Sequence, residues 1–163
     1  MNASLRSPLK FDIQGLVRAI VYNVSRDSFL PALTPAQWEM LSGYLQPFTL
    51  MPGQLLIEQN AIDRTLYLVE TGALTVHYED DQGRIRLAEV GPGSVVGEGA
   101  FFTRQPRSAT VQSNGITKVW CLTPIRFKEL SSREPGVALE WAMALGSLVS
   151  RRLVNTPKRP AVT

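Results

Sequence analysis

An acidic residue flanked by glycines, followed by an arginine, carries the clearest chemical signal in this sequence. The arginine and a serine open the next apolar run, nine residues after the acid. Small residues at the start of a helix let its unpaired backbone amides approach an anion closely. The arginine adds a planar fork of donors that suits phosphate oxygens, and the serine adds a hydroxyl. The residues concerned are Gly97, Glu98, Gly99, Ala100, Arg107 and Ser108.

The acid beside this predicted anion site needs its own explanation, because like charges repel. Glu98 fits if it accepts hydrogen bonds from a sugar hydroxyl of the same ligand, and the combination then indicates a pocket for a cyclic phosphoribose. Simpler interpretations stay open for each residue alone. Arg107 is compatible with an exposed strand arginine that pairs with a carboxylate, and Glu98 with an acid favoured by the dipole at a helix start. Only their joint spacing favours a ligand.

The first part of the chain shows helical patterns. Residues 11–24 place apolar side chains at three- and four-residue spacing and predict an amphipathic helix. Its apolar face is expected to pack on this chain or on a second copy, and docking on a different protein is the alternative. Thr34, followed by Pro35, predicts the start of a second short helix that runs to about Tyr44.

Between residues 48 and 122 the apolar pattern changes to short runs typical of strands, separated roughly every eight to twelve positions by turn residues. This spacing predicts an antiparallel barrel or sandwich. Helix is predicted again from Thr123 and up to Leu153, where Arg151 and Arg152 are expected at a solvated helix end. The candidate strands are Leu55 to Glu58, Leu66 to Glu70, Leu74 to Tyr78, Ile85 to Val90, Arg107 to Gln112 and Thr117 to Leu122.

The composition bounds the class of protein. The chain has 163 residues, 44% hydrophobic and 19% charged, with a formal net charge of +3, which is typical of one compact domain with an ordinary polar surface. Cys121 and His77 are its single cysteine and histidine; they exclude an internal disulfide and argue against a metal site of two or three imidazoles. The apolar stretch at residues 15–24 contains Arg18 and falls short of the ~20 residues that span a bilayer, so we expect a cytoplasmic protein.

The motif at residues 97–111 resembles the phosphate-binding cassette of the cyclic-nucleotide-binding domain family. That family includes the bacterial catabolite activator proteins, the regulatory subunits of cyclic AMP-dependent kinase and the cyclic-nucleotide-gated channels. Glycine turns elsewhere in the chain follow the order and spacing of the family. These turns contain Gly53, Gly72, Gly83, Gly91 and Gly93.

The resemblance covers about residues 34–153 and implies a mainly β fold with flanking helices. The expected architecture is an antiparallel β-roll, a jelly-roll-like double-stranded barrel, with N-terminal helices and a C-terminal helix pair. The resemblance also divides the chain into an N-terminal helical extension (1–33), the cyclic-nucleotide-binding domain (34–153) and a basic tail (154–163).

The resemblance implies a role for each residue of the cassette. Glu98 is expected to bind the ribose 2′-hydroxyl. Arg107 and Ser108 are expected to bind the cyclic phosphate, and the backbone amides of residues 97–100 to complete the phosphate cradle.

The other expected contacts depend on weaker matches. Val76 and Leu87 fall where members of the family pack apolar side chains near the sugar and base, which requires the right hairpin register. Gly99 stands where the family usually has a leucine or a similar residue that links the cassette to the moving helices. Thr156 lies near the position of a polar base contact, but Pro157 prevents ordinary continuation of the helix.

The resemblance implies a cyclic-nucleotide receptor. No pair of nucleophile and base, second carboxylate or metal cluster accompanies the cassette in the sequence, so we expect neither an enzyme nor a cofactor or metal. Cyclic AMP is the preferred ligand. Ser108 leaves cyclic GMP open, because in some relatives a hydroxyl beside the arginine reaches the guanine amino group. The ten residues after Leu153 are too few for the winged helix that follows this domain in the family's transcription factors, so we expect no DNA binding within this chain.

The expected output of this bacterial-type module is a conformational shift that exposes or hides a surface for an unidentified effector protein. A homodimer through the C-terminal helix stays open, because Trp141, Leu145 and Leu148 fit either pairing or packing on the barrel. The competing hypothesis is an interaction scaffold that retains the fold and does not bind nucleotide. Gly99 and the shortened helix support that alternative.

Overall fold

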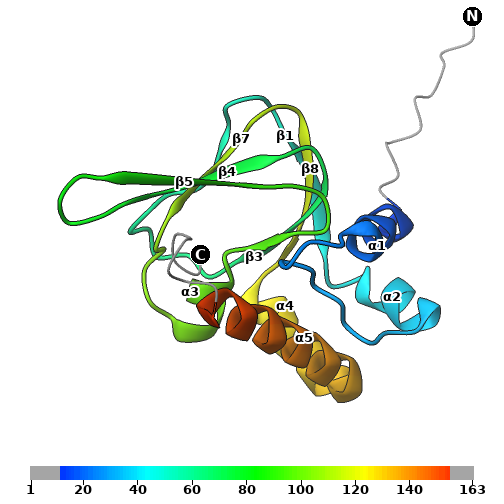
Figure 1. The fold of residues 1–163 in the computed structure, drawn as a ribbon. Coiled ribbons are helices and arrows are strands. Elements are labelled where there is room, and N and C mark those ends of the chain that lie inside the picture. Colours follow the sequence, from blue (N-terminus) through cyan, green and yellow to red (C-terminus); the bar gives the residue numbers. More distant parts are fainter. Residues whose placement is uncertain (1–11, 155–163) are drawn as a thin grey trace, which may run out of the picture.

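The computed structural model describes residues 12–154, except for the side chain of Arg86. In this part of the chain, eight strands form two antiparallel sheets that face each other as a roll, and helices cover one end of it (Figure 1). The strand orders are β1-β8-β3-β6 and β2-β7-β4-β5. The expected mainly β architecture with flanking helices is confirmed. The strands are β1 (Gln46–Leu50), β2 (Leu55–Ile57), β3 (Leu66–Thr71), β4 (Leu74–Glu79), β5 (Ile85–Val90), β6 (Val95–Val96), β7 (Thr110–Ser113) and β8 (Thr117–Leu122).

The inner faces of the two sheets form an apolar core. Side chains of a strand alternate between its two faces, and in β4 the alternation buries Leu74 and Val76. Val111 of β7 and Val119 of β8 are buried in the same cluster. Full burial of each such side chain contributes roughly 1.5–3 kcal/mol to the stability of the roll. This core fixes the strands that carry the neighbouring loops.

A second apolar core joins the helices to the other face of the β1-β8-β3-β6 sheet. Trp141 is fully buried in it and contacts the rings of Phe29 and Trp38 edge to face, with centroid distances of 4.8 and 6.2 Å. Leu145 and Leu148 are buried in the same core, so the predicted apolar face of the last helix packs on its own chain. The helices are α1 (Ile13–Tyr22), α2 (Pro35–Leu41), α3 (Glu98–Thr103), α4 (Pro124–Arg133) and α5 (Pro135–Val154).

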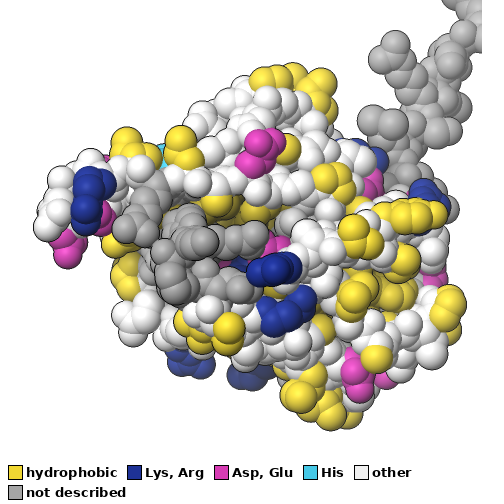
Figure 2. Space-filling view, in the orientation of Figure 1, with side chains coloured by type: hydrophobic (Ala, Val, Ile, Leu, Met, Phe, Trp, Pro, Cys, Tyr) yellow, Lys and Arg dark blue, Asp and Glu magenta, His cyan; other side chains and the backbone are white. Residues whose placement is uncertain are grey.

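The N-terminal helix α1 also packs on this chain. Its apolar side chains Ile13, Leu16 and Ile20 are buried in the helical core, which is the first of the two alternatives for this helix. Other apolar side chains nearby stay exposed, including Val21 and Leu30. Figure 2 shows hydrophobic side chains gathered over the α1 and α2 side of the molecule.

Predicted and observed boundaries agree where turn and cap residues mark them. Thr34 caps α2 by accepting a hydrogen bond from the Gln37 N–H (3.2 Å), and β5 and β8 have the predicted bounds. The second helix ends at Leu41, earlier than predicted. The sequence pattern does not predict β1 or β6. β1 contains Pro47, which a sheet tolerates at an edge strand, and β6 has only two residues.

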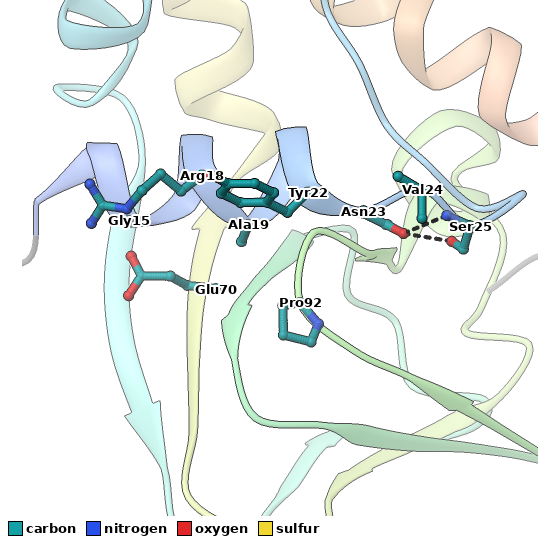
Figure 3. Close-up of a pocket in the computed structure, with 9 residues that line it drawn as sticks. All are labelled: Gly15, Arg18, Ala19, Tyr22, Asn23, Val24, Ser25, Glu70 and Pro92. Atoms are coloured by element: carbon teal, nitrogen blue, oxygen red, sulfur yellow. Dashed lines mark hydrogen bonds between the residues drawn. The ribbon is translucent and has the colours of Figure 1, made fainter.

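A buried carboxylate lies directly beneath α1. Glu70 accepts a hydrogen bond from Trp120 Nε1 (3.1 Å) and pairs with Lys118 Nζ (2.8 Å). Figure 3 shows Gly15 of α1 beside this carboxylate, and a Cβ atom on Gly15 would lie 2.5 Å from Glu70 Oε1. Since two partners hold Glu70 in place, α1 approaches the sheet this closely only without a side chain at residue 15.

Gly15→Ala is expected to lower the free energy of unfolding by about 1–3 kcal/mol, because the methyl group overpacks the contact with Glu70. Gly146 is the matched control, since it also lies inside a helix and nothing lies within 4 Å of a Cβ placed there. Gly146→Ala is expected to raise the free energy of unfolding by roughly 0.5–1 kcal/mol. Urea unfolding followed by tryptophan fluorescence measures both. Stabilisation by both substitutions would contradict the constraint at Gly15.

Candidate functional site

Gly97 brings the start of α3 against the arginine of the predicted cassette. Its φ angle is +87°, in the left-handed region that favours glycine. A Cβ atom on Gly97 would lie 2.6 Å from Arg107 Nη1 and 2.8 Å from the Thr65 carbonyl oxygen. A side chain at this position would therefore displace the arginine, which explains the glycine before Glu98.

Arg107 is almost completely buried, with 2% of its surface exposed. Its Nη1 donates to the Gly97 carbonyl oxygen (3.1 Å), and its Nη2 donates to the Thr65 carbonyl oxygen (2.7 Å) and to Asp63 Oδ2 (2.8 Å). Its Nε is buried and has no hydrogen-bond acceptor within residues 12–154. A buried donor without an acceptor is costly. The Nε of Arg107 is therefore the donor that a further acceptor would satisfy.

The backbone of Arg107 lies in a loop and not in a strand. Its N–H donates to Ala61 (2.9 Å), and its carbonyl oxygen accepts from the N–H of Asn60 (2.8 Å). Arg107 thus pairs with the turn at residues 60–61 and not with a strand of the sheet. The strand β7 begins at Thr110, so the strand predicted from residue 107 starts too early. The interpretation of Arg107 as an exposed strand arginine is also wrong.

Asp63 supplies the negative charge nearest to Arg107. Burial works to raise the pKa of Asp63, but hydrogen bonds from Arg107 and Thr65 and the positive charge of Arg107 outweigh it and lower the pKa below its ordinary value. Asp63 stays half exposed while Arg107 does not. The sequence analysis misses Asp63, because its only local signal is a turn in which it accepts from the Thr65 N–H (3.1 Å).

The first turn of α3 presents backbone amides beside this arginine. The N–H of Phe101 donates to the Gly97 carbonyl oxygen (3.2 Å) as the first intrahelical bond, so the amides of Gly99 and Ala100 precede the repeating helical pattern. Ala100 is buried and Gly99 is half buried. Ser108 follows Arg107 and is half buried. The structure thus brings together all six residues of the predicted cassette.

Glu98 is completely buried, and an arginine of α5 lies against it. Arg152 Nη1 donates to Glu98 Oε1 (2.6 Å), and Arg152 Nη2 donates to the Val95 carbonyl oxygen (2.9 Å). Arg152 Nε lies 3.5 Å from Asp27 Oδ1. The expectation of a solvated helix end is therefore wrong for Arg152, whose side chain is only 13% exposed. Figure 1 shows α3 beside the C-terminal end of α5.

Val76 and Leu87 lie on opposite faces of their sheet. Val76 pairs with Ala88 and is buried in the roll, whereas Leu87 pairs with His77 and is 67% exposed. Because successive side chains of a strand alternate, the register that turns Val76 inward turns Leu87 outward. The expectation that both residues line the sugar and base is wrong for Leu87. The expected base contact of Thr156 lies outside the described residues.

A cavity lies away from the cassette, between α1 and the turn before β6. It has a volume of about 610 Å³ and is lined by residues that include Tyr22, Asn23 and Pro92 (Figure 3). Asn23 Oδ1 accepts from the backbone and side chain of Ser25, and Glu70 is neutralised by Lys118. None of the cassette residues lines this cavity.

The part of the chain that the structure describes has no group of three or more His, Cys, Asp or Glu side chains that could hold a metal ion. None of its helices is long and apolar enough to cross a membrane.

The structure thus combines a β-roll with a buried arginine beside a glycine-rich helix start. Residues 47–134 match the cyclic nucleotide-binding domain family, and the chain belongs to this family. It is 34% identical over 83 residues to the acetyltransferase Pat of Mycolicibacterium smegmatis, which covers 51% of this chain and 25% of that protein. It is 32% identical over 112 residues to the Pycsar effector protein BcPycTIR of Burkholderia cepacia, which covers 68% of this chain and 36% of that protein. The chain thus matches about a third or less of the length of these relatives.

Solved structures agree with this assignment. A cyclic nucleotide-binding domain from Methylobacillus flagellatus superposes with a TM-score of 0.78 at 19% identity, covering 91% of this chain and 85% of that one. The catabolite activator protein of Thermus thermophilus superposes with a TM-score of 0.70 at 26% identity, covering 77% of this chain and 58% of that one. The fold of this chain is therefore the β-roll of the family.

The pKa of Asp63 predicts a response of stability to acid. Because its folded pKa lies below the ordinary value of 3.8, ionised Asp63 stabilises the fold fully above that value, and this contribution is lost as the pH falls through the lowered pKa. Asp63→Asn is expected to make the free energy of unfolding depend less on pH below about pH 4.

Urea titrations at a series of pH values measure this dependence. Asp81→Asn is the control, because it neutralises an exposed residue of the β4–β5 turn and is expected to keep the wild-type dependence. If the free energy of unfolding of Asp63→Asn depends on pH as that of the wild type does, the role assigned to the ion pair between Asp63 and Arg107 is contradicted.

Proposed function

We propose that this chain is a receptor module for a cyclic nucleotide, with cyclic AMP preferred to cyclic GMP. The observation that carries the proposal is the buried guanidinium of Arg107, whose Nε has no acceptor within the described residues. Three of its other donors are already bound to acceptors of the protein, so its position is set before a ligand arrives. A cyclic phosphate oxygen supplies the missing acceptor and one negative charge.

The neighbouring groups support the same ligand. The early amides of α3 and the hydroxyl of Ser108 offer further donors to the phosphate, and Glu98 offers an acceptor to the ribose 2′-hydroxyl. The helix α3 is short, so its amides support the phosphate only together with Arg107. Val76 is expected to pack near the sugar from the inner face of β4.

The preference for cyclic AMP rests on the relatives. The chain is 30% identical over 79 residues to a cAMP-dependent protein kinase regulatory subunit of Blastocladiella emersonii. Cyclic GMP remains the second candidate, because the hydroxyl of Ser108 lies next to the phosphate-binding arginine and a cGMP-dependent protein kinase of Plasmodium berghei is also related, at 32% identity over 90 residues.

We infer that the module regulates a partner and does not itself catalyse a reaction. Among the described residues, no group of three or more His, Cys, Asp or Glu side chains could hold a metal ion, and the family model that matches residues 47–134 is that of a binding domain. The output passes to an effector protein through a shift of the helices.

A second proposed contact is the pairing of two copies through the exposed side of α5. Leu139 and Met143 lie one turn apart on this side and are exposed. Light scattering tests this pairing.

The contact between Arg152 and Glu98 favours the alternative of a scaffold that does not bind nucleotide, because Arg152 already uses the carboxylate expected to bind ribose. The melting temperature, measured with a panel of purine and pyrimidine cyclic nucleotides, distinguishes the two functions. A receptor is expected to melt at a higher temperature with its ligand, and a scaffold is expected to show no change with any of them.

Isothermal titration calorimetry tests the receptor directly. Arg107→Ala is expected to bind cyclic AMP about ten- to a hundredfold more weakly than the wild type, because it removes a charge-assisted contact of about 1.5–3 kcal/mol. Arg126→Ala is the control, since Arg126 pairs with Glu129 on the surface of α4 and is expected to bind like the wild type.

The melting temperature of Arg107→Ala checks that the variant is folded at the temperature of the titration. A folded Arg107→Ala variant with wild-type affinity, or a wild type that gives no heat with millimolar cyclic AMP or cyclic GMP, would contradict the receptor.

A further inference from the structure

Arg152 connects three segments that are far apart in the sequence. Its guanidinium contacts Glu98 of α3, the Val95 carbonyl oxygen of β6 and Asp27 of the connection between α1 and α2. The Asp27 contact is the longest of these, at 3.5 Å. Arg152 therefore lies between two carboxylates, one in the cassette and one in the N-terminal extension.

Arg151 fixes the same connection from the neighbouring position of α5. It donates to the carbonyl oxygens of Arg26 (3.1 Å) and Ser28 (2.5 Å) and to the Ser28 hydroxyl (3.3 Å). These are contacts to backbone and hydroxyl groups, which do not depend on the cassette. The end of α5 thus holds residues 26–28 with one arginine and links them to the cassette with the next.

Glu98 is accessible to a ribose hydroxyl only after a rearrangement. Its side chain has no exposed surface, and Arg152 is one of the groups that cover it. An arginine and a ribose hydroxyl that approach one fully buried carboxylate compete for the space around it. Asp27 lies beside the Nε of Arg152 and offers a second carboxylate to the guanidinium when it moves.

We propose that Arg152 is an internal competitor of the cyclic nucleotide for Glu98, and that its displacement transmits ligand binding to the α1–α2 connection. This inference rests on the proposed receptor function and names its regulation. Without nucleotide, Arg152 holds Glu98, α5 and residues 26–28 together. With nucleotide, the ribose takes Glu98, Arg152 turns to Asp27 alone, and the connection loses its link to the cassette.

The affinity for nucleotide measures this competition. When a closed form excludes the ligand, the apparent affinity falls in proportion to the open fraction. Arg152→Gln is therefore expected to bind cyclic AMP about tenfold more tightly than the wild type, which corresponds to about nine closed molecules in ten. Coupling is reciprocal, so nucleotide weakens the Arg152 contact by the same factor.

Three variants separate this role from other effects of removing an arginine. Arg152→Lys keeps the charge beside Glu98 but has no planar fork, and an affinity between those of the wild type and Arg152→Gln is expected. Arg151→Gln removes the hydrogen bonds to residues 26 and 28 and keeps Arg152, so it is expected to bind nucleotide like the wild type. Arg126→Gln repeats the change of charge at an exposed arginine that pairs with Glu129 on α4, and is expected to have no effect.

Hydrogen exchange of the full chain measures the transmission. The amide of Ser28, which donates to the Ser25 carbonyl oxygen (3.2 Å), reports on the connection. Residues 26–30 are expected to exchange faster when cyclic AMP is added to the wild type. In Arg152→Gln they are expected to exchange fast already and to respond little to nucleotide. This response would not be seen if Arg152 only filled space at the end of α5.

The outcomes distinguish this inference from the receptor itself. If no variant and no wild-type sample binds a cyclic nucleotide, the receptor function fails. If the wild type binds and Arg152→Gln binds with equal or lower affinity while it remains folded, the competition is overturned and the receptor function stands. If affinity rises but exchange at residues 26–30 stays insensitive to nucleotide, the transmission is overturned.

Discussion

The cassette depends on the hydrogen bonds of the buried Arg107 guanidinium. A positive charge with 2% exposure is tolerated only with close acceptors, because an unpaired buried charge is strongly unfavourable. The Gly97 and Thr65 carbonyl oxygens and the Asp63 carboxylate provide them. These contacts fix the helix start, the strand β3 and the turn before it relative to one another, and they exclude a side chain at residue 97. The geometry of the proposed phosphate site therefore depends on one arginine.

Most of the fold follows from patterns that are local in the sequence. Turn glycines and alternating side chains define β4, β5 and β8, and Thr34 with Pro35 defines the start of α2. The elements that the pattern misses are stabilised mainly by their neighbours. β1 contains a proline and pairs along one side with β8, and β6 is two residues long. Neither has enough periodicity to be distinguished from a loop, so only the assembled sheet identifies them.

The candidate site also has one part that the sequence predicts and another part that only the structure shows. Residues 97–108 are contiguous, and their types alone predict the cassette. The charges that act on it come from other segments: Asp63 is 44 residues from Arg107, and Arg152 is 54 residues from Glu98. Such contacts leave no spacing signal, because an aspartate in a turn and an arginine near a helix end are ordinary surface residues. Leu87 fails for a related reason, since strand alternation gives its relation to Val76 only when the register is known.

The two arginines of the site differ in a way that suits different tasks. Arg107 is held mainly by backbone carbonyl groups, which cannot turn away, and a fixed donor stabilises a phosphate without reorganisation. Arg152 contacts carboxylate side chains from two different segments and the Val95 carbonyl oxygen. In the proposed competition these two carboxylates are its alternative partners, and a ligand shifts a population between two such arrangements. In the proposed receptor, a rigid Arg107 would provide affinity and a movable Arg152 would provide the response, which gives a role to both the buried guanidinium and the covered acid.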